Sequence, residues 1–196
     1  MTLRPQAVIR QHPEISNTDD VQAAGRNPTT PETMRYRRAF QPGGSFFFTV
    51  VTAHRRPVFT SEIAVALLRD AFRAVRQKRP FAIDAIVILP DHLHCIWTLP
   101  EDDADFMTRW RLIKTWFSKH AGLKDVWQHR YWEHVLRDER DFIKHVDYIH
   151  YNPVKHGLAS KVIDWPYSSF HRYVEHGMCA EDWGGDVVDM TGVGRE

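Results

Sequence analysis

Two histidines stand one residue apart inside an apolar run, "LPDHLHCIW", at residues 89–97. Side chains of a strand alternate between its two faces, so His92 and His94 should project from one face while Leu93 and Cys95 project from the other. Two imidazoles aimed in one direction can hold a divalent ion, but a histidine among apolar residues is more often a hydrogen-bonded core residue. The pair therefore indicates a metal site only if the chain supplies further ligands.

A second set of reactive side chains lies about fifty residues later, in "HVDYIHYNPVKHGL". Tyr148 and Asn152 are four residues apart, which makes them neighbours one turn apart on a helix. The same flank carries His145 and Asp141 and lies beside the apolar stripe that we expect to face the core. A tyrosine near a helix end and an asparagine at its C-terminus are also ordinary structural choices, so this segment alone does not define a site.

Together the two segments indicate phosphodiester chemistry. Two imidazoles and one amide oxygen offer three neutral ligands to a divalent ion and leave positions for a phosphate oxygen. A tyrosine hydroxyl, with an unperturbed pKa of about 10, is a poor nucleophile at neutral pH and gains from a nearby cation or base. Tyr148 is the expected nucleophile, and Tyr151 is the rival, although it lies on a different face from Asn152.

The elements that must position these groups follow from apolar periodicity. We expect strands at 45–55, 81–89 and 92–99, the last two forming a hairpin, a further strand or irregular hairpin at 126–136, and a short packed appendage at 164–173. Helices are expected at 61–79, 106–122 and 139–151, the last ending before Pro153. The predicted inward-facing residues are Ile63, Leu67, Ala71 and Val75; Phe106, Trp110, Ile113 and Phe117; and Phe142, Val146 and Ile149.

This order predicts an α+β fold, a ferredoxin-like split β-α-β arrangement with a mostly antiparallel sheet and helices packed over one face. We expect an extended or disordered arm at 1–34, one domain at 35–172 and an acidic tail at 173–196. Residues 35–172 hold 22 Lys and Arg against 15 Asp and Glu, so a polyanionic partner is plausible for this basic body.

Several classes of protein are excluded by composition. No apolar run approaches the roughly 20 residues that cross a bilayer, and the N-terminus has no apolar segment typical of a secretory signal. Cys95 and Cys179 are the two cysteines, which indicates no disulfide framework. We therefore expect a cytoplasmic protein that does not bind membranes.

The runs "VILPDHLHCIWTLP" and "HVDYIHYNPVKHGL" resemble those of the single-tyrosine HUH transposases, and within them the REP-associated tyrosine transposases of bacteria. The resemblance implies that His92, His94 and Asn152 are ligands of Mg²⁺ or Mn²⁺ and that Tyr148 is the catalytic nucleophile. The wider family commonly has glutamine where this chain has Asn152. Zinc is a lesser alternative, since two histidines also suit it.

The same resemblance implies that the partner is single-stranded or hairpin DNA from repetitive extragenic palindromes. Basic side chains can neutralise phosphates and exposed aromatic rings can stack on unpaired bases. The residues that we expect to contact DNA are Arg35, Arg37, Arg38, Arg109, Arg111, Lys114, Lys155 and His156. For Arg109, Arg111 and Lys114 the alternative is an ordinary solvated helix face.

The function that follows is a site-specific single-stranded DNA endonuclease and transposase that forms a 5′-phosphotyrosine and rejoins strands. One alternative is a domesticated, non-catalytic protein that binds repetitive palindromic DNA. Another is a metal-free two-histidine phosphoesterase, which would need a second H-x-[ST] motif that the chain lacks. The sequence leaves the oligomeric state undecided between a monomer and a homodimer, because relatives can place the tyrosine beside a partner's histidines.

Overall fold

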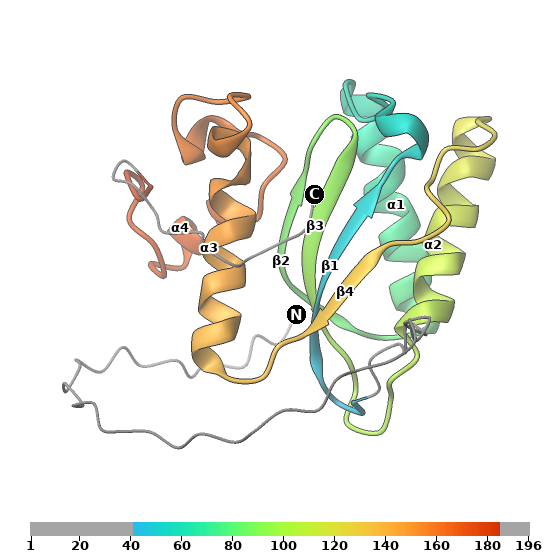
Figure 1. Cartoon of the computed structure of the whole chain (residues 1–196), viewed down its shortest axis with the longest axis horizontal. Coiled ribbons are helices and arrows are strands. Elements are labelled where there is room, and N and C mark those ends of the chain that lie inside the picture. The colour runs from blue at the N-terminus through green and yellow to red at the C-terminus, as the bar shows by residue number, and fades with distance from the viewer. Residues whose placement is uncertain (1–40, 185–196) are drawn as a thin grey trace, which may run out of the picture. The chain divides into compact units, whose positions relative to one another are not determined.

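The computed structural model describes residues 41–184. In chain order the elements are β1 (Ser45–Val51), η1 (Ala53–Arg55), α1 (Glu62–Lys78), β2 (Ala82–Ile88), β3 (His92–Thr98), α2 (Phe106–Ala121), β4 (Trp132–Val135), α3 (Glu139–Lys155), η2 (Val162–Asp164) and α4 (Phe170–Glu175). The expected order of strands and longer helices is confirmed, and short helical turns complete it (Figure 1). None of the helices in this range is both long and apolar enough to cross a membrane.

The four strands form one sheet in the order β2-β3-β1-β4, and every neighbouring pair is antiparallel. The predicted hairpin is β2 and β3, and β3 also pairs with β1, so the strand that carries the two histidines is in the middle of the sheet. The α+β, ferredoxin-like class is confirmed. The segment that could have been a strand or an irregular hairpin contains the four-residue strand β4 at the sheet edge.

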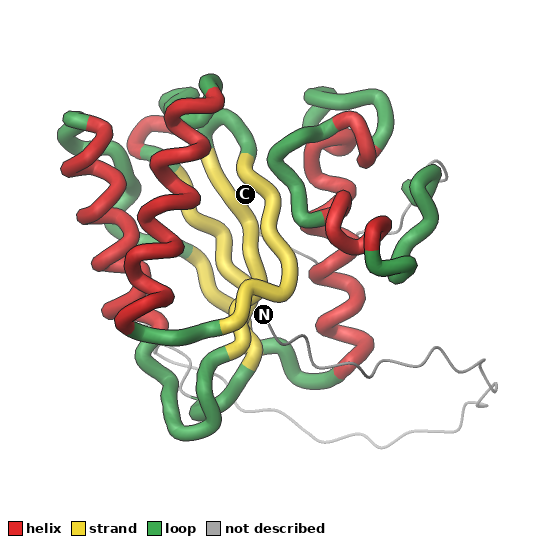
Figure 2. The backbone as a smooth tube through the Cα atoms, turned by 180° about the vertical axis from the view of Figure 1, so that it is seen from behind, coloured by secondary structure: helices red, strands yellow, loops and turns green. Residues whose placement is uncertain are grey.

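Helices α1 and α2 pack together on one face of this sheet, as Figures 1 and 2 show from opposite sides. Their inward side chains meet alternate residues of the two central strands, including Phe46 and Phe48 of β1 and Cys95 and Trp97 of β3. All four inward residues predicted for α2 are buried. On α1 the pattern differs, because Ile63 in the first turn is 75% exposed and Val65 is buried instead.

Helix α3 covers the other face, so the expectation that all helices lie over one face is wrong (Figure 2). The reason is strand alternation: Phe47 of β1 and Ile96 of β3 point away from α1 and α2 and are fully buried beneath α3. Both faces of the central strands carry large side chains, and each therefore needs its own cover.

The helix ends show how local sequence sets these elements. Ser61 caps α1 by accepting a bond from the Ala64 backbone, and Gly122 ends α2 with a φ of 65°, which favours glycine. Helix α3 does not stop before Pro153 but continues to Lys155. A proline two residues from the end removes one helical hydrogen bond and leaves the preceding turns intact, so the helix tolerates it there.

The expected domain limits fall partly outside residues 41–184, since the arm at 1–34 is not among the described residues. At the other end, α4 runs past residue 172, where we expect the acidic tail to begin. Tyr173 packs against the core under α3 and donates a hydrogen bond to the Asp84 carbonyl. The division into arm, domain and tail remains a prediction.

Candidate functional site

The two histidines of β3 lie on the sheet face that α3 covers. His92 and His94 are 2% and 0% exposed, and their ring centroids are 4.9 Å apart. Leu93, Cys95 and Trp97 alternate with them and belong to the core under α1 and α2. The H-x-H spacing therefore places both imidazoles side by side on the face away from the main apolar core, as strand geometry predicts.

Each imidazole is oriented through its Nδ1 atom. His92 Nδ1 is 2.6 Å from Asp91 Oδ1, and His94 Nδ1 is 2.9 Å from the hydroxyl of Thr49, its cross-strand neighbour. Burial raises the pKa of Asp91, but the hydrogen bond to His92 and the ion pair with Arg55 outweigh it and lower that pKa. With Nδ1 engaged in this way, Nε2 is the nitrogen through which each ring could coordinate an ion.

Tyr148 of α3 reaches the same place from the opposite side. Its ring centroid lies 5.2 Å from that of His94 and 5.9 Å from that of Phe47, and the residue is 1% exposed. The Lys155 ammonium lies 4.9 Å from the centre of the tyrosine ring. A strand and a helix thus bring together, within one chain, an imidazole pair and a phenol that are more than fifty residues apart in the sequence.

Asn152 lies one turn beyond Tyr148, and His156 lies one turn further. The His156 ring centroid is 5.4 Å from that of His92, just as Tyr148 is close to His94. Asn152 is fully buried between these two residues on the same flank of the helix. The amide therefore belongs to the segment of α3 that faces both histidines.

The rival tyrosine, Tyr151, is on another side of α3. Its ring lies close to Gly184, in the segment after α4. A Cβ atom added to Gly184 would be 3.5 Å from Tyr151 Cδ2 and closer still to Val162 of η2. Tyr151 therefore faces the C-terminal segments. This position favours Tyr148 over Tyr151 as the residue that could react beside the histidines.

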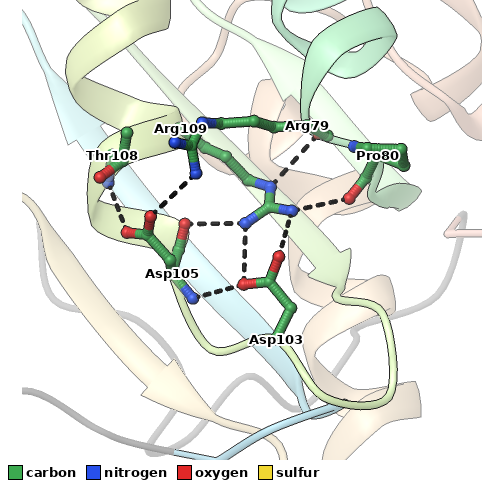
Figure 3. Close-up of polar contacts among 6 residues, drawn as sticks. All are labelled: Arg79, Pro80, Asp103, Asp105, Thr108 and Arg109. Carbon is green, nitrogen blue, oxygen red and sulfur yellow. Dashed lines mark hydrogen bonds and ion pairs between the residues drawn. The ribbon is translucent and has the colours of Figure 1, made fainter.

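Arg109 is a buried residue of α2 and does not lie at the surface, where the predicted contact with DNA would require it. The side chain is 1% exposed, and its guanidinium donates five hydrogen bonds, two of them to the Asp103 carboxylate and three to backbone carbonyls (Figure 3). The carbonyls belong to Arg79, Pro80 and Asp105. Arg109 therefore ties the end of α1 to the start of α2, and its bonds to Asp103 lower the pKa of that carboxyl.

The other residues predicted to contact DNA have different positions. Lys155 and His156 are exposed at the edge of the candidate site. Arg111 is exposed and Lys114 is half-buried, donating to the Gln128 carbonyl, but both are on α2, across the sheet from the histidines. The remaining three, Arg35, Arg37 and Arg38, lie outside the described residues.

Some contributors to the site were not predicted from the sequence. Asp91 directly precedes His92 in the sequence, and this position could have indicated that its carboxylate orients the His92 ring. Thr49 gives no such signal, because it meets His94 only through the register of β1 and β3. His134 of β4, which lies outside this site, was also missed, although the two residues that it contacts, Asp141 and His145, were expected on one helix flank.

A central strand with two adjacent imidazoles, facing a helix with a phenol and an amide, has the side chains needed to hold a cation beside a nucleophile. This is the class that the resemblance to single-tyrosine HUH transposases implies. A comparison with models of protein families gives no match. Individual proteins do match over most of the chain.

A protein of Escherichia coli strain K12, named REP-associated tyrosine transposase, is 51% identical over 157 residues, which cover 80% of this chain and 94% of that protein. A Haemophilus influenzae protein named for the same family is 41% identical over 165 residues, 77% of this chain and 93% of its own length. A solved structure of a REP-associated tyrosine transposase bound to a REP hairpin has 48% identity and a TM-score of 0.76, covering 84% of this chain and 99% of that one. The chain belongs to the family of REP-associated tyrosine transposases.

Proposed function

We propose that this protein is a transposase that acts on REP-type hairpin DNA and cleaves its single-stranded part. Its relatives carry the name of REP-associated transposases, and a similar chain has been solved with a REP hairpin. The observation that carries the chemical part of the proposal is the 5.2 Å separation between the Tyr148 and His94 rings. This contact lies within one chain, so the proposed cleavage does not need a second copy.

In the proposed reaction the Tyr148 hydroxyl oxygen attacks the scissile phosphorus. A bond forms between that oxygen and phosphorus with loss of the phenolic proton to the solvent. The bond from phosphorus to the 3′ oxygen breaks, and the departing oxygen takes up a proton to become a 3′-hydroxyl. The product is a 5′-phosphotyrosine, which retains the energy of the broken diester, so a 3′-hydroxyl can reverse the attack and rejoin strands. Lys155, whose ammonium lies over the tyrosine ring, favours the phenolate electrostatically.

His92, His94 and Asn152 are the residues that would hold a divalent ion. The fit is supported by the hydrogen bonds that join Nδ1 of the two rings to the Asp91 carboxylate and the Thr49 hydroxyl, because such partners commonly orient metal-binding imidazoles. Mg²⁺ or Mn²⁺ suits a site that also takes phosphate oxygens, and zinc is the lesser choice. An ion held by these residues would polarise the phosphodiester and offset the charge that develops during its exchange.

The DNA contacts in this proposal divide into two sets. Lys155 and His156 border the histidines and could contact the phosphates next to the cleaved bond. Arg111 and Lys114 on α2 could hold a more distant part of the hairpin, because they lie across the sheet. Arg35, Arg37 and Arg38 remain predicted contacts outside the described residues.

The test uses a hairpin oligonucleotide with a single-stranded extension and measures its covalent attachment to the protein. The label lies on the fragment that would carry the 5′ phosphate after cleavage. The parent protein with Mg²⁺ or Mn²⁺ should give a labelled adduct that survives denaturing electrophoresis. Tyr148→Phe should give none, while Tyr151→Phe is the matched control and should give the parent's yield. If Tyr148→Phe still forms the adduct, the nucleophile is wrong; if the parent binds the hairpin without any adduct, a non-catalytic DNA-binding protein is the better description.

A further inference from the structure

A second group of side chains suited to metal binding lies at the other end of α3. His134 of β4 and Asp141 and His145 of α3 each offer one ligand atom, and these three atoms lie within 4.8 Å of one another. His134 Nε2 is 3.0 Å from Asp141 Oδ2, and His145 Nδ1 is 3.1 Å from Asp141 Oδ1. The two imidazole rings are nearly parallel, with centroids 5.0 Å apart.

This group is separate from the site around His94. The ring of Phe47 stands between the two, with its centroid 4.8 Å from that of His145 and 5.6 Å from that of His94. The ligands also come from different strands, since β4 is at the sheet edge and β3 is central. An ion held by His134 and His145 would therefore not be the ion proposed for the cleavage reaction.

The local structure brings these ligands together without the help of a distant segment. Asp141 and His145 are four residues apart and so lie one above the other on α3. β4 runs into α3 through a short connection (Figure 1). His134 of β4 contacts Asp141 in the first turn of the helix. The Asp138 carboxylate accepts a bond from the Asp141 backbone and fixes the helix start.

We propose that His134, Asp141 and His145 form a second cation site, for a transition metal such as Zn²⁺ rather than for Mg²⁺. Two imidazole nitrogens and one carboxylate oxygen are typical zinc ligands, and a water or another group can complete a tetrahedron. Mg²⁺ prefers oxygen ligands and retains its water. The proposed catalytic site can add phosphate oxygens of the DNA to its two imidazoles, whereas this group offers one carboxylate oxygen, so a transition metal suits it better.

Such an ion would join the edge strand to the helix that carries Tyr148. His145 precedes Tyr148 by three residues, so a cation at this point holds the turn from which the phenol projects. The Asp141 carboxylate is hydrogen-bonded to His134 and accepts a bond from the Arg137 backbone, and His145 Nδ1 is 2.8 Å from the Asp141 carbonyl oxygen. The alternative to a metal site is thus an internal ion-pair network, which the following experiment distinguishes.

The full chain with both proposed catalytic ligands removed, His92→Ala/His94→Ala, is dialysed against Zn²⁺ at low micromolar free concentration, and the retained metal is measured by mass spectrometry. We expect one equivalent of zinc. Adding His134→Ala should reduce it to near zero, whereas adding His129→Ala, at an exposed histidine five residues earlier in the chain, should leave one equivalent. No retained zinc in the double variant, or unchanged zinc after His134→Ala, would overturn the site.

Cobalt absorption provides a second measurement that does not depend on stoichiometry. Co²⁺ added to the His92→Ala/His94→Ala protein should give intense visible bands of a four-coordinate ion, and Asp141→Asn or His134→Gln should abolish them. Circular dichroism must show that each variant is folded. Bands that persist in folded His134→Gln protein would contradict the proposal, and the hairpin-cleavage test of Tyr148 is independent of either result.

Discussion

The two faces of the sheet use neighbouring residues of the same strands for different purposes. On the α1 and α2 face, Trp97 stacks on Trp110 with ring centroids 4.2 Å apart, and aromatic side chains fill the interior. On the α3 face, His94 is surrounded by Thr49, Phe47 and Tyr148, which include a hydroxyl and a phenol. Because side chains alternate along β3, stability and chemistry can be changed independently by substitutions only a few residues apart.

The strongest test of this division pairs Trp97→Ala with His94→Ala. Trp97→Ala should lower the free energy of unfolding by about 3–5 kcal/mol, because it leaves a large cavity in a packed core. His94→Ala should lower hairpin cleavage by about a hundredfold or more, since it removes a proposed metal ligand. Urea denaturation and single-turnover cleavage measure the two effects.

Both variants must be measured for stability and for cleavage. Trp97→Ala protein that is still folded under the assay conditions should keep most of its cleavage rate per folded molecule, and His94→Ala should lose less stability than Trp97→Ala. If both variants lose stability and cleavage in equal proportion, the two faces are not functionally separate.

Much of this arrangement is predictable from local pattern. The two-residue period of "HLHCIW" places the histidines on one face, and the four-residue spacing of Tyr148 and Asn152 places them on one helix flank. Local pattern does not reveal which face of the sheet a helix covers, because an apolar stripe packs equally well on either side. The position of α3 is set by pairings between distant strands, and so is the contact of Thr49 with His94.

Burial of a charged side chain is the feature that local pattern predicts least well. Arg109 and Arg111 are two residues apart in a basic helix, yet one is enclosed and the other exposed. The difference arises from Arg79 and Pro80, whose carbonyls come from the end of α1. Such acceptors are recognisable only once the two helices are packed together.

The next prediction concerns Arg109, which supports the face opposite the histidines. Arg109→Lys keeps the charge but loses the forked geometry that bonds Asp103 and the carbonyls, so the free energy of unfolding should fall by about 2–4 kcal/mol. Arg111→Ala, at an exposed position, should cost less than about 0.5 kcal/mol. Chemical denaturation measures both. An Arg109→Lys protein with normal stability but weakened binding to the hairpin would restore Arg109 as a DNA contact.

A smaller effect should appear in the pH dependence of stability, on the α3 side. Burial raises the pKa of Asp147 to about 6, above its unfolded value of 3.8, so its contribution to stability is present at low pH and is lost as the pH rises towards 6. Burial lowers the pKa of His150 to about 3, so this residue acts in the opposite direction and destabilises the fold as the pH falls below about 6.5.

Asp147→Asn removes one of these opposing contributions. Relative to the parent, the variant should gain about 1–2 kcal/mol as the pH rises from about 4 to about 6, a range that allows for solvent screening at this half-buried position. Urea denaturation across this range measures the difference. The same charge change at exposed Asp102 is the control and should reproduce the parent's profile. A constant difference between Asp147→Asn and the parent would contradict the assignment.

The smallest predicted effect is that of removing the Thr49 hydroxyl. This substitution tests whether the chemistry on the α3 face can be changed with little loss of stability. Thr49→Val keeps the shape of the side chain but removes the hydroxyl 2.9 Å from His94 Nδ1. Loss of such an orienting partner should weaken metal binding by about tenfold, while the free energy of unfolding falls by only about 1 kcal/mol. Cleavage by the variant should therefore need more Mn²⁺ and approach the parent's rate at saturation, and Thr49→Ser should restore the parent's metal dependence. Identical Mn²⁺ titrations for Thr49→Val and the parent would mean that this hydrogen bond orients the imidazole for packing alone.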